Sequence, residues 1–232
     1  MQTPTVLVKG RGPSIDFLSS PTVAIQVGTG PVKDELHAHQ ALLRARCRFF
    51  RRILNEDSYA HTTTPILFGQ STYAVKKYLE ILYKGLYKSG NNERTRPARP
   101  LYDLEHTLAV FRFACHIEDA EQLNRTLVTI IAHVEKDGTC PPLSVISAIM
   151  DSKSVKAREW LLDLFVEKGR STWSASFREQ SYALDLHEDI NGKFCSRRDN
   201  PPTKAVDPFD ASSYMLDVEA YTKGVGGDGN KC

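Results

Sequence analysis

The 232-residue chain has no strong excess of either charge and no long apolar run. It carries 30 Lys and Arg against 28 Asp and Glu, a formal net charge of +2, which gives no strong field to attract nucleic acid. No apolar stretch approaches the roughly 20 residues needed to cross a bilayer, and residues 1–20 lack the apolar segment of a secretory signal. We therefore expect an intracellular protein, nuclear or cytoplasmic, that does not contact a membrane.

The chain also lacks paired cysteines. Its 5 cysteines are scattered and form no Cys-x-x-Cys pair, so we expect reduced thiols rather than a disulfide framework. Cys47 and Cys115 lie in apolar helical stretches and are expected to be buried as small hydrophobic residues. His37 and His39 would point to opposite faces of a strand and could not easily share one ion. We expect no metal site and no cofactor.

Catalytic signatures are missing as well. The sequence contains no G-x-S-x-G, H-E-x-x-H, Walker or G-x-G-x-x-G motif. Gly28 and Gly30 follow a strand pattern, but Pro31 comes next and no helix opens there, so a phosphate cradle is not expected. We predict no catalytic residue and no enzymatic activity. A thiol enzyme would require Cys47 or Cys115 to be exposed with a lowered pKa.

Alternating hydrophobicity predicts a small sheet near the N-terminus. The apolar residues of 22–28 fall on one face, as in a half-buried strand. A turn at 28–31 leads to a second strand over 32–38, which can pair back as a hairpin. A short apolar run at 65–69 is typical of one more strand.

Helical periodicity accounts for most of the remaining chain. A helical region is expected over 40–54, with arginines on its polar face, and a helix over 71–85. Residues 88–100 read as a solvated loop, since they are rich in Arg, Asn and Pro and hold no aliphatic residue larger than Ala. Further helical segments are expected at 101–115, 117–134, 143–150 and 155–168, with a weaker one at 173–186.

Three segments carry a resemblance to a known family. In the first, a strand leads into His39 and at once into a helix of Ala, Leu and Arg that closes on Phe49 and Phe50. The second is the stretch VKKYLEILYKGLY that begins at Val75, and the third is LAVFRFACHIEDAEQL, which begins at Leu108. Their order and spacing resemble the BTB/POZ domain over about 22–134, and the long loop and helical tail are similar to fungal members.

The resemblance implies an α+β fold, a small sheet packed against a cluster of helices, and a function in protein–protein interaction. We expect a flexible arm at 1–20, a BTB/POZ domain at 21–136 including the loop 88–100, a helical extension at 141–190 and a disordered tail at 197–232. In the family, homodimers form through the first strand and the first helix. The interface residues implied here are Val23, Ile25, Val27, Ala41, Leu42, Arg44, Ala45, Arg48, Leu54 and Glu56.

Two roles fit such a module. One is a substrate adaptor for a cullin ubiquitin ligase, for which Leu54-Asn55-Glu56 has the expected hydrophobic-x-Glu spelling but lies a few residues early. The other is a homotypic assembly factor in nuclear or transcriptional regulation, which needs no such motif. A competing class is a basic nucleic-acid-binding protein that uses the arginines between Arg44 and Arg52 to grip phosphates.

Overall fold

The computed structural model describes residues 19–28, 31, 33–54, 66–87, 104–138, 140–152, 154–169, 183–202 and 206–217. The chain divides into two compact units. Unit 1 comprises residues 1–102 and 116–119, and unit 2 comprises residues 103–115 and 120–232. The expected domain limits at 21–136 and 141–190 follow from the family resemblance rather than from compactness, and they stay predictions.

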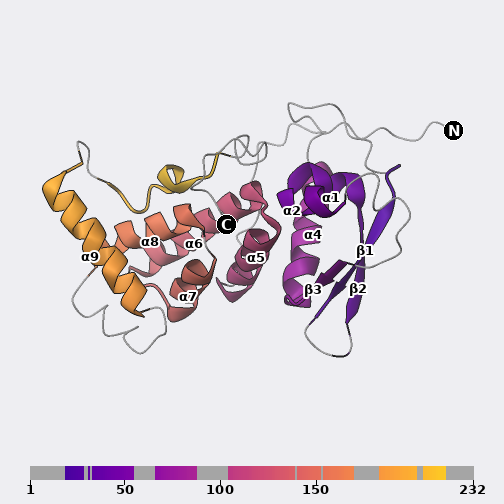
Figure 1. The fold of residues 1–232 in the computed structure, drawn as a ribbon, viewed down its shortest axis with the longest axis horizontal. Helices are drawn as coiled ribbons and strands as arrows, with labels where there is room; N and C mark the ends of the chain where they lie inside the picture. The colour runs from indigo at the N-terminus through magenta and orange to yellow at the C-terminus, as the bar shows by residue number, and fades with distance from the viewer. Residues whose placement is uncertain are drawn as a thin grey trace. The chain divides into compact units, whose positions relative to one another are not determined.

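Unit 1 contains a sheet with the strand order β2-β1-β3 (Figure 1). Strand β1 (Thr22–Val27) pairs antiparallel with β2 (Asp34–His39), and parallel with β3 (Ile66–Phe68) along its last three residues, Ile25 to Val27. The alternating apolar residues of β1 point into the core, as the sequence pattern predicts. The three expected strands are thus confirmed, and β1 is the middle one.

Among the residues of unit 1 that the structure describes, two helices follow β2 and one follows β3. They are α1 (Gln40–Arg46), α2 (Arg48–Ile53) and α4 (Thr72–Tyr87). The helical region expected at 40–54 is present but broken, because Cys47 has an extended backbone with φ −120° and ψ 131°. The expectation that Cys47 lies within a helix was therefore wrong. No Gly or Pro marks the break, and the Cys47 side chain contacts residues far along the chain.

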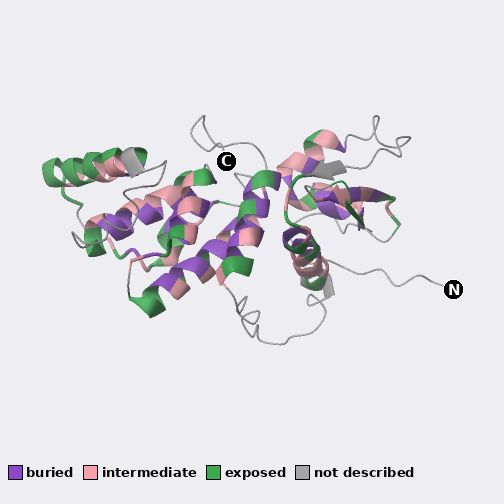
Figure 2. Cartoon of the chain, turned by 90° about the horizontal axis from the view of Figure 1, so that it is seen from below, coloured by how far each residue is buried: buried purple, intermediate pink, exposed green. Residues whose placement is uncertain are grey.

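Unit 2 is built from helices (Figure 1). Those at the expected positions are α5 (Leu104–Ile117, whose last two residues belong to unit 1), α6 (Ala120–Asp137), α7 (Leu143–Asp151) and α8 (Val155–Lys168). Their buried faces form one hydrophobic core, seen as purple ribbon in Figure 2. Ser154 caps α8 by accepting a hydrogen bond from the backbone N–H of Ala157. Helices predominate in this α+β chain, as expected.

The C-terminal part of unit 2 differs from the expectation. Helix α9 (Ala183–Asp199) runs past the weak segment predicted at 173–186, and a short 3-10 helix, η3 (Ala211–Tyr214), follows it. Residues 206–217 were expected in a disordered tail, but Tyr214 and Leu216 are buried in the core of unit 2. The Asn124 side-chain amide also donates to the carbonyl of Leu216 and accepts from its N–H, at 2.9 and 2.8 Å. Composition alone does not reveal such anchors.

Candidate protein-interaction surface

The β1 residues of the expected interface belong to the core of unit 1. Val23, Ile25 and Val27 are 5%, 1% and 0% exposed. Strand β1 also lies between β2 and β3, so its backbone has no free edge along Ile25 to Val27. These side chains stabilise the unit by burial and are not available to a partner in this conformation, and strand addition at this part of β1 is blocked.

The helical part of the expected interface is partly at the surface. Leu42 and Leu54 are buried, at 4% and 1% exposure, and Glu56 lies outside the described residues. The other side chains are exposed or half-buried, and we call them the α1 surface: Ala41, Arg44 and Ala45 of α1, and Arg48, the first residue of α2. They lie just after the point where β2 passes directly into α1.

The arginines beyond α1 are engaged within unit 1. The guanidinium of Arg52 donates to both carboxylate oxygens of Glu118, at 3.1 and 2.5 Å, and Arg48 Nε lies 3.7 Å from the same carboxylate. The backbone of Glu118 has φ 58°, a left-handed conformation that residues other than Gly rarely adopt. The bidentate hydrogen bond from Arg52 stabilises this strained turn between α5 and α6.

A buried polar trio connects the break between α1 and α2 with α4. The Tyr78 hydroxyl donates to Asp119 Oδ2 at 2.9 Å and lies 2.8 Å from Cys47 Sγ. Since the single phenol proton goes to the carboxylate, the thiol donates to the phenol oxygen. Arg46 stands 4.0 Å from the other oxygen of Asp119. The trio therefore satisfies a carboxylate whose side chain is only 1% exposed.

The buried thiols do not meet the requirements of a thiol enzyme. Cys47 and Cys115 are 0% and 8% exposed, as predicted for structural cysteines. Burial, reinforced by the negative charge of Asp119, raises the pKa of the Cys47 thiol well above its ordinary value, and burial likewise raises the pKa of the Tyr78 phenol. Cys47 is therefore a protonated, inaccessible thiol rather than an activated nucleophile.

The two histidines of the strand end have different surroundings. His39 is half-buried at the junction of β2 and α1, where its backbone N–H donates to the Tyr83 hydroxyl at 3.0 Å and its Nδ1 lies 2.8 Å from the same oxygen. His37 is exposed and lies 3.2 Å from Glu35. The two rings therefore serve different contacts, and His39 links the start of α1 to α4. Within the described part of the chain, no three His, Cys, Asp or Glu side chains are placed to hold a metal ion.

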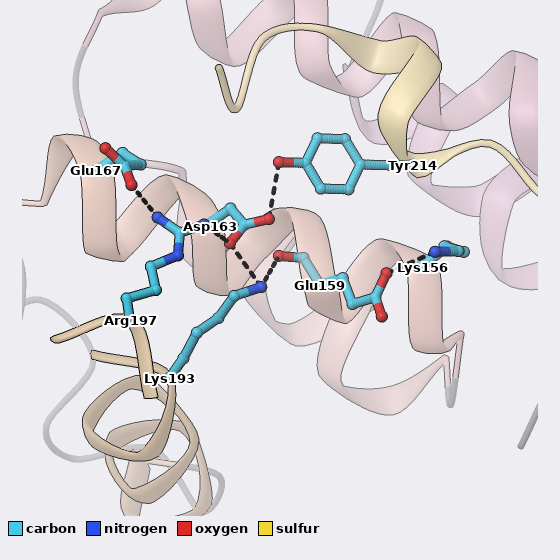
Figure 3. A network of polar contacts seen from close by, with 7 residues as sticks. All are labelled: Lys156, Glu159, Asp163, Glu167, Lys193, Arg197 and Tyr214. Carbon is cyan, nitrogen blue, oxygen red and sulfur yellow. Dashed lines mark hydrogen bonds and ion pairs between the residues drawn. The ribbon is translucent and has the colours of Figure 1, made fainter. Parts of the chain in front are cut away.

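A second polar network joins α8, α9 and η3 in unit 2 (Figure 3). Asp163 on α8 is 5% exposed, and it accepts from Lys193 Nζ at 2.5 Å, from the Arg197 guanidinium, and from the Tyr214 hydroxyl at 2.9 Å. Arg197 also pairs with Glu167. Burial, together with the hydrogen bond to Asp163, raises the pKa of the Tyr214 phenol. Sequence reasoning missed this network, whose members lie 30 to 51 residues apart and form no motif.

None of the helices in the described residues has the length and apolarity to span a membrane. Comparison of the chain with protein-family models, with curated proteins and with solved structures found no match. The contacts described above are therefore the basis for any statement about function.

Proposed function

We propose that this chain is a protein-interaction module of the BTB/POZ type, with a non-catalytic, homotypic assembly role. The observation that carries the proposal is the passage of the β1–β2 hairpin through His39 directly into α1. This is the order in which the first sequence motif places strand, His and helix. The strand β3 and the helix α4, which contains the second motif, then follow in the element order that the resemblance implies.

The α1 surface supports self-association through a helix face. Ala41 and Ala45 are four residues apart and lie on one side of the helix, where their small side chains let a second helix approach closely. A two-fold axis would bring the same surface of two copies together. Because β1 has no free edge along Ile25 to Val27, the helix carries this contact in our proposal.

The other two candidate functions have less support. In the cullin-adaptor motif, Leu54 is buried and so does not present its side chain to a partner. In the nucleic-acid alternative, Arg48 and Arg52 would have to release Glu118 before binding phosphates. Neither alternative is supported by an observation comparable to the α1 surface, whose side chains are exposed or half-buried.

Light scattering of the full chain at low and high salt tests the proposal. We expect a mass twice that of the chain at both salt concentrations, because a mainly apolar contact is weakly screened. Ala45→Glu should give a monomer, whereas Ala132→Glu, which also changes an exposed helical alanine but in α6, should leave the dimer intact. A monomeric wild type, or equal effects of the two variants, would contradict the proposal.

A further inference from the structure

Helix α9 is attached to α8 mainly through charged side chains. Among the described side chains of α9, Leu186 is the buried one, Ile190 packs partly against the core, and most others are exposed. Figure 2 accordingly draws α9, at the left, almost wholly in green and pink. The polar attachments are Arg158 to Asp189 at 2.6 Å, Lys193 to Asp163 at 2.5 Å, and Arg197 to Asp163 and Glu167.

The charges on the two helices match in spacing. Asp163 and Glu167, four residues apart, turn their carboxylates toward α9 and form one acidic ridge along α8, whereas the Glu159 carboxylate pairs with Lys156 on its own helix. Lys193 and Arg197, also four residues apart, point at this ridge from α9 (Figure 3), and Lys193 reaches the backbone oxygen of Glu159 as well. The ridge thus accepts two cations presented one helical turn apart, and in this structure Lys193 and Arg197 of α9 supply them.

The attachment of α9 is weak compared with the packing of the core helices. The side chains of Arg158 and Asp189 are 37% and 39% exposed, and a pair of this kind contributes up to about fivefold to an equilibrium constant. The attraction of Asp163 for its two cations is offset by the cost of removing their charges from water. If α9 leaves, that cost is recovered.

Gly192 weakens α9 further. It lies inside the helix, where Gly is less favourable than Ala by about fivefold in equilibrium constant. An added Cβ at this position would meet nothing within 4 Å, so packing does not require a Gly. The residue lowers the stability of α9 and gives no contact in exchange.

We propose that α9 is a charge-held latch, which opens locally and uncovers the acidic ridge of α8 for a basic helix of a partner protein. Tyr214 comes from η3 rather than from α9, and its hydroxyl keeps the Asp163 carboxylate in place when α9 leaves. The structure is then the closed, self-occupied state of the surface. The partner is recognised by Lys or Arg side chains at four-residue spacing, which is what Lys193 and Arg197 present.

Hydrogen exchange followed by mass spectrometry on the full chain tests the latch. Arg197→Gln should speed exchange of the α9 amides by about fivefold relative to wild type, and Gly192→Ala should slow it by a similar factor. High salt should act like Arg197→Gln, since it screens the pairs.

Arg198→Gln is the matched control for this experiment. Arg198 is 68% exposed and pairs with its neighbour Asp199, so its substitution should not change the exchange of α9. Local opening requires these changes to stay within α9. Parallel changes in α8 would overturn the proposal.

A labelled peptide of residues 183–199 tests the acidic ridge by fluorescence anisotropy. It should bind Arg197→Gln more tightly than wild type, and wild type more tightly than Gly192→Ala, because each chain's own α9 competes for the ridge. A peptide in which both Lys193 and Arg197 are replaced by Gln should lose this binding. Equal binding to all three chains, binding that survives loss of the two basic residues, or no binding to any chain would overturn the assignment of the ridge as a docking surface.

Discussion

At the scale of single residues, Cys47 and Tyr78 make stability sensitive to alkaline pH. Both groups are buried in their protonated form and have a raised pKa in the folded chain, against ordinary values of 9.0 and 10.0. Their contribution is complete below pH 9 and is lost as the pH rises toward the folded values. We expect the free energy of unfolding, measured in urea, to fall by about 1.4 kcal/mol per pH unit for each group, above pH 9.0 for Cys47 and above pH 10.0 for Tyr78.

The readout for this prediction is the difference between variants. Tyr214 also has a raised pKa and contributes to the total slope, so wild type is compared with Tyr78→Phe and Cys47→Ala over pH 8 to 11. Each variant should be less stable at pH 8, because a buried partner is lost, and each should show a shallower alkaline decline. A decline as steep as that of wild type in both variants would contradict the assignment.

Glu118 allows backbone strain and ion pairing to be separated. Glu118→Ala removes the contacts with Arg48 and Arg52 but keeps a Cβ at φ 58°. Glu118→Gly removes the same contacts and relieves the left-handed strain. We therefore expect Glu118→Gly to be more stable than Glu118→Ala by about 1 kcal/mol in urea denaturation. Equal stability of the two variants would show that the turn is not strained.

At the scale of the elements, Ser154 supports the start of α8. Its hydroxyl accepts from the Ala157 N–H, and the side chain is 4% exposed. Ser154→Ala should destabilise unit 2 by about 1 kcal/mol in thermal unfolding. Ser147→Ala is the matched control, because the Ser147 hydroxyl makes an exposed contact with Asp151, and it should have a much smaller effect. A loss of similar size in the two variants would argue against a capping role.

An element could be predicted where neighbouring residues in the sequence determine it, and could not where contacts between distant residues do. Strand β1 and the helices α7 and α8 follow from alternation, periodicity and the stop at Gly169, which are local signals. The break at Cys47 depends on Tyr78, 31 residues away. The extent of α9 depends on Asp163, 30 residues before its partner Lys193. Tertiary contacts of this kind leave no periodic pattern in the sequence.

The sequence predicted only part of the candidate interface. The apolar pattern of β1 identifies Val23, Ile25 and Val27 as the buried face of a strand, but not whether they face a core or a partner. That distinction depends on β3, whose pairing joins residues about 40 positions apart. Helical spacing predicts the half-buried Arg48 on the polar face, away from Leu42. It places Ala45, three residues after the buried Leu42, beside the apolar stripe, so the exposure of Ala45 could not be predicted.

At the scale of the whole molecule, the two units contain separate buried thiols that report on their stability. Cys47 lies in unit 1 and Cys115 in unit 2. In the native chain, iodoacetamide should modify the exposed Cys195 quickly and both buried thiols slowly, since buried thiols react only when the structure around them opens. Peptide mass spectrometry then gives one opening rate for each unit in a single experiment.

Matched core substitutions should separate these rates. Val27 in β1 and Val145 in α7 are both 0% exposed, and truncating either to Ala should cost about 2 kcal/mol in its own unit. We expect Val27→Ala to speed the labelling of Cys47 by about thirtyfold and to change Cys115 less, with the opposite order for Val145→Ala. The division into two compact units requires this difference. If either substitution accelerates both thiols equally, the chain unfolds as one cooperative body, and the local opening proposed for α9 must then be measured against that global transition.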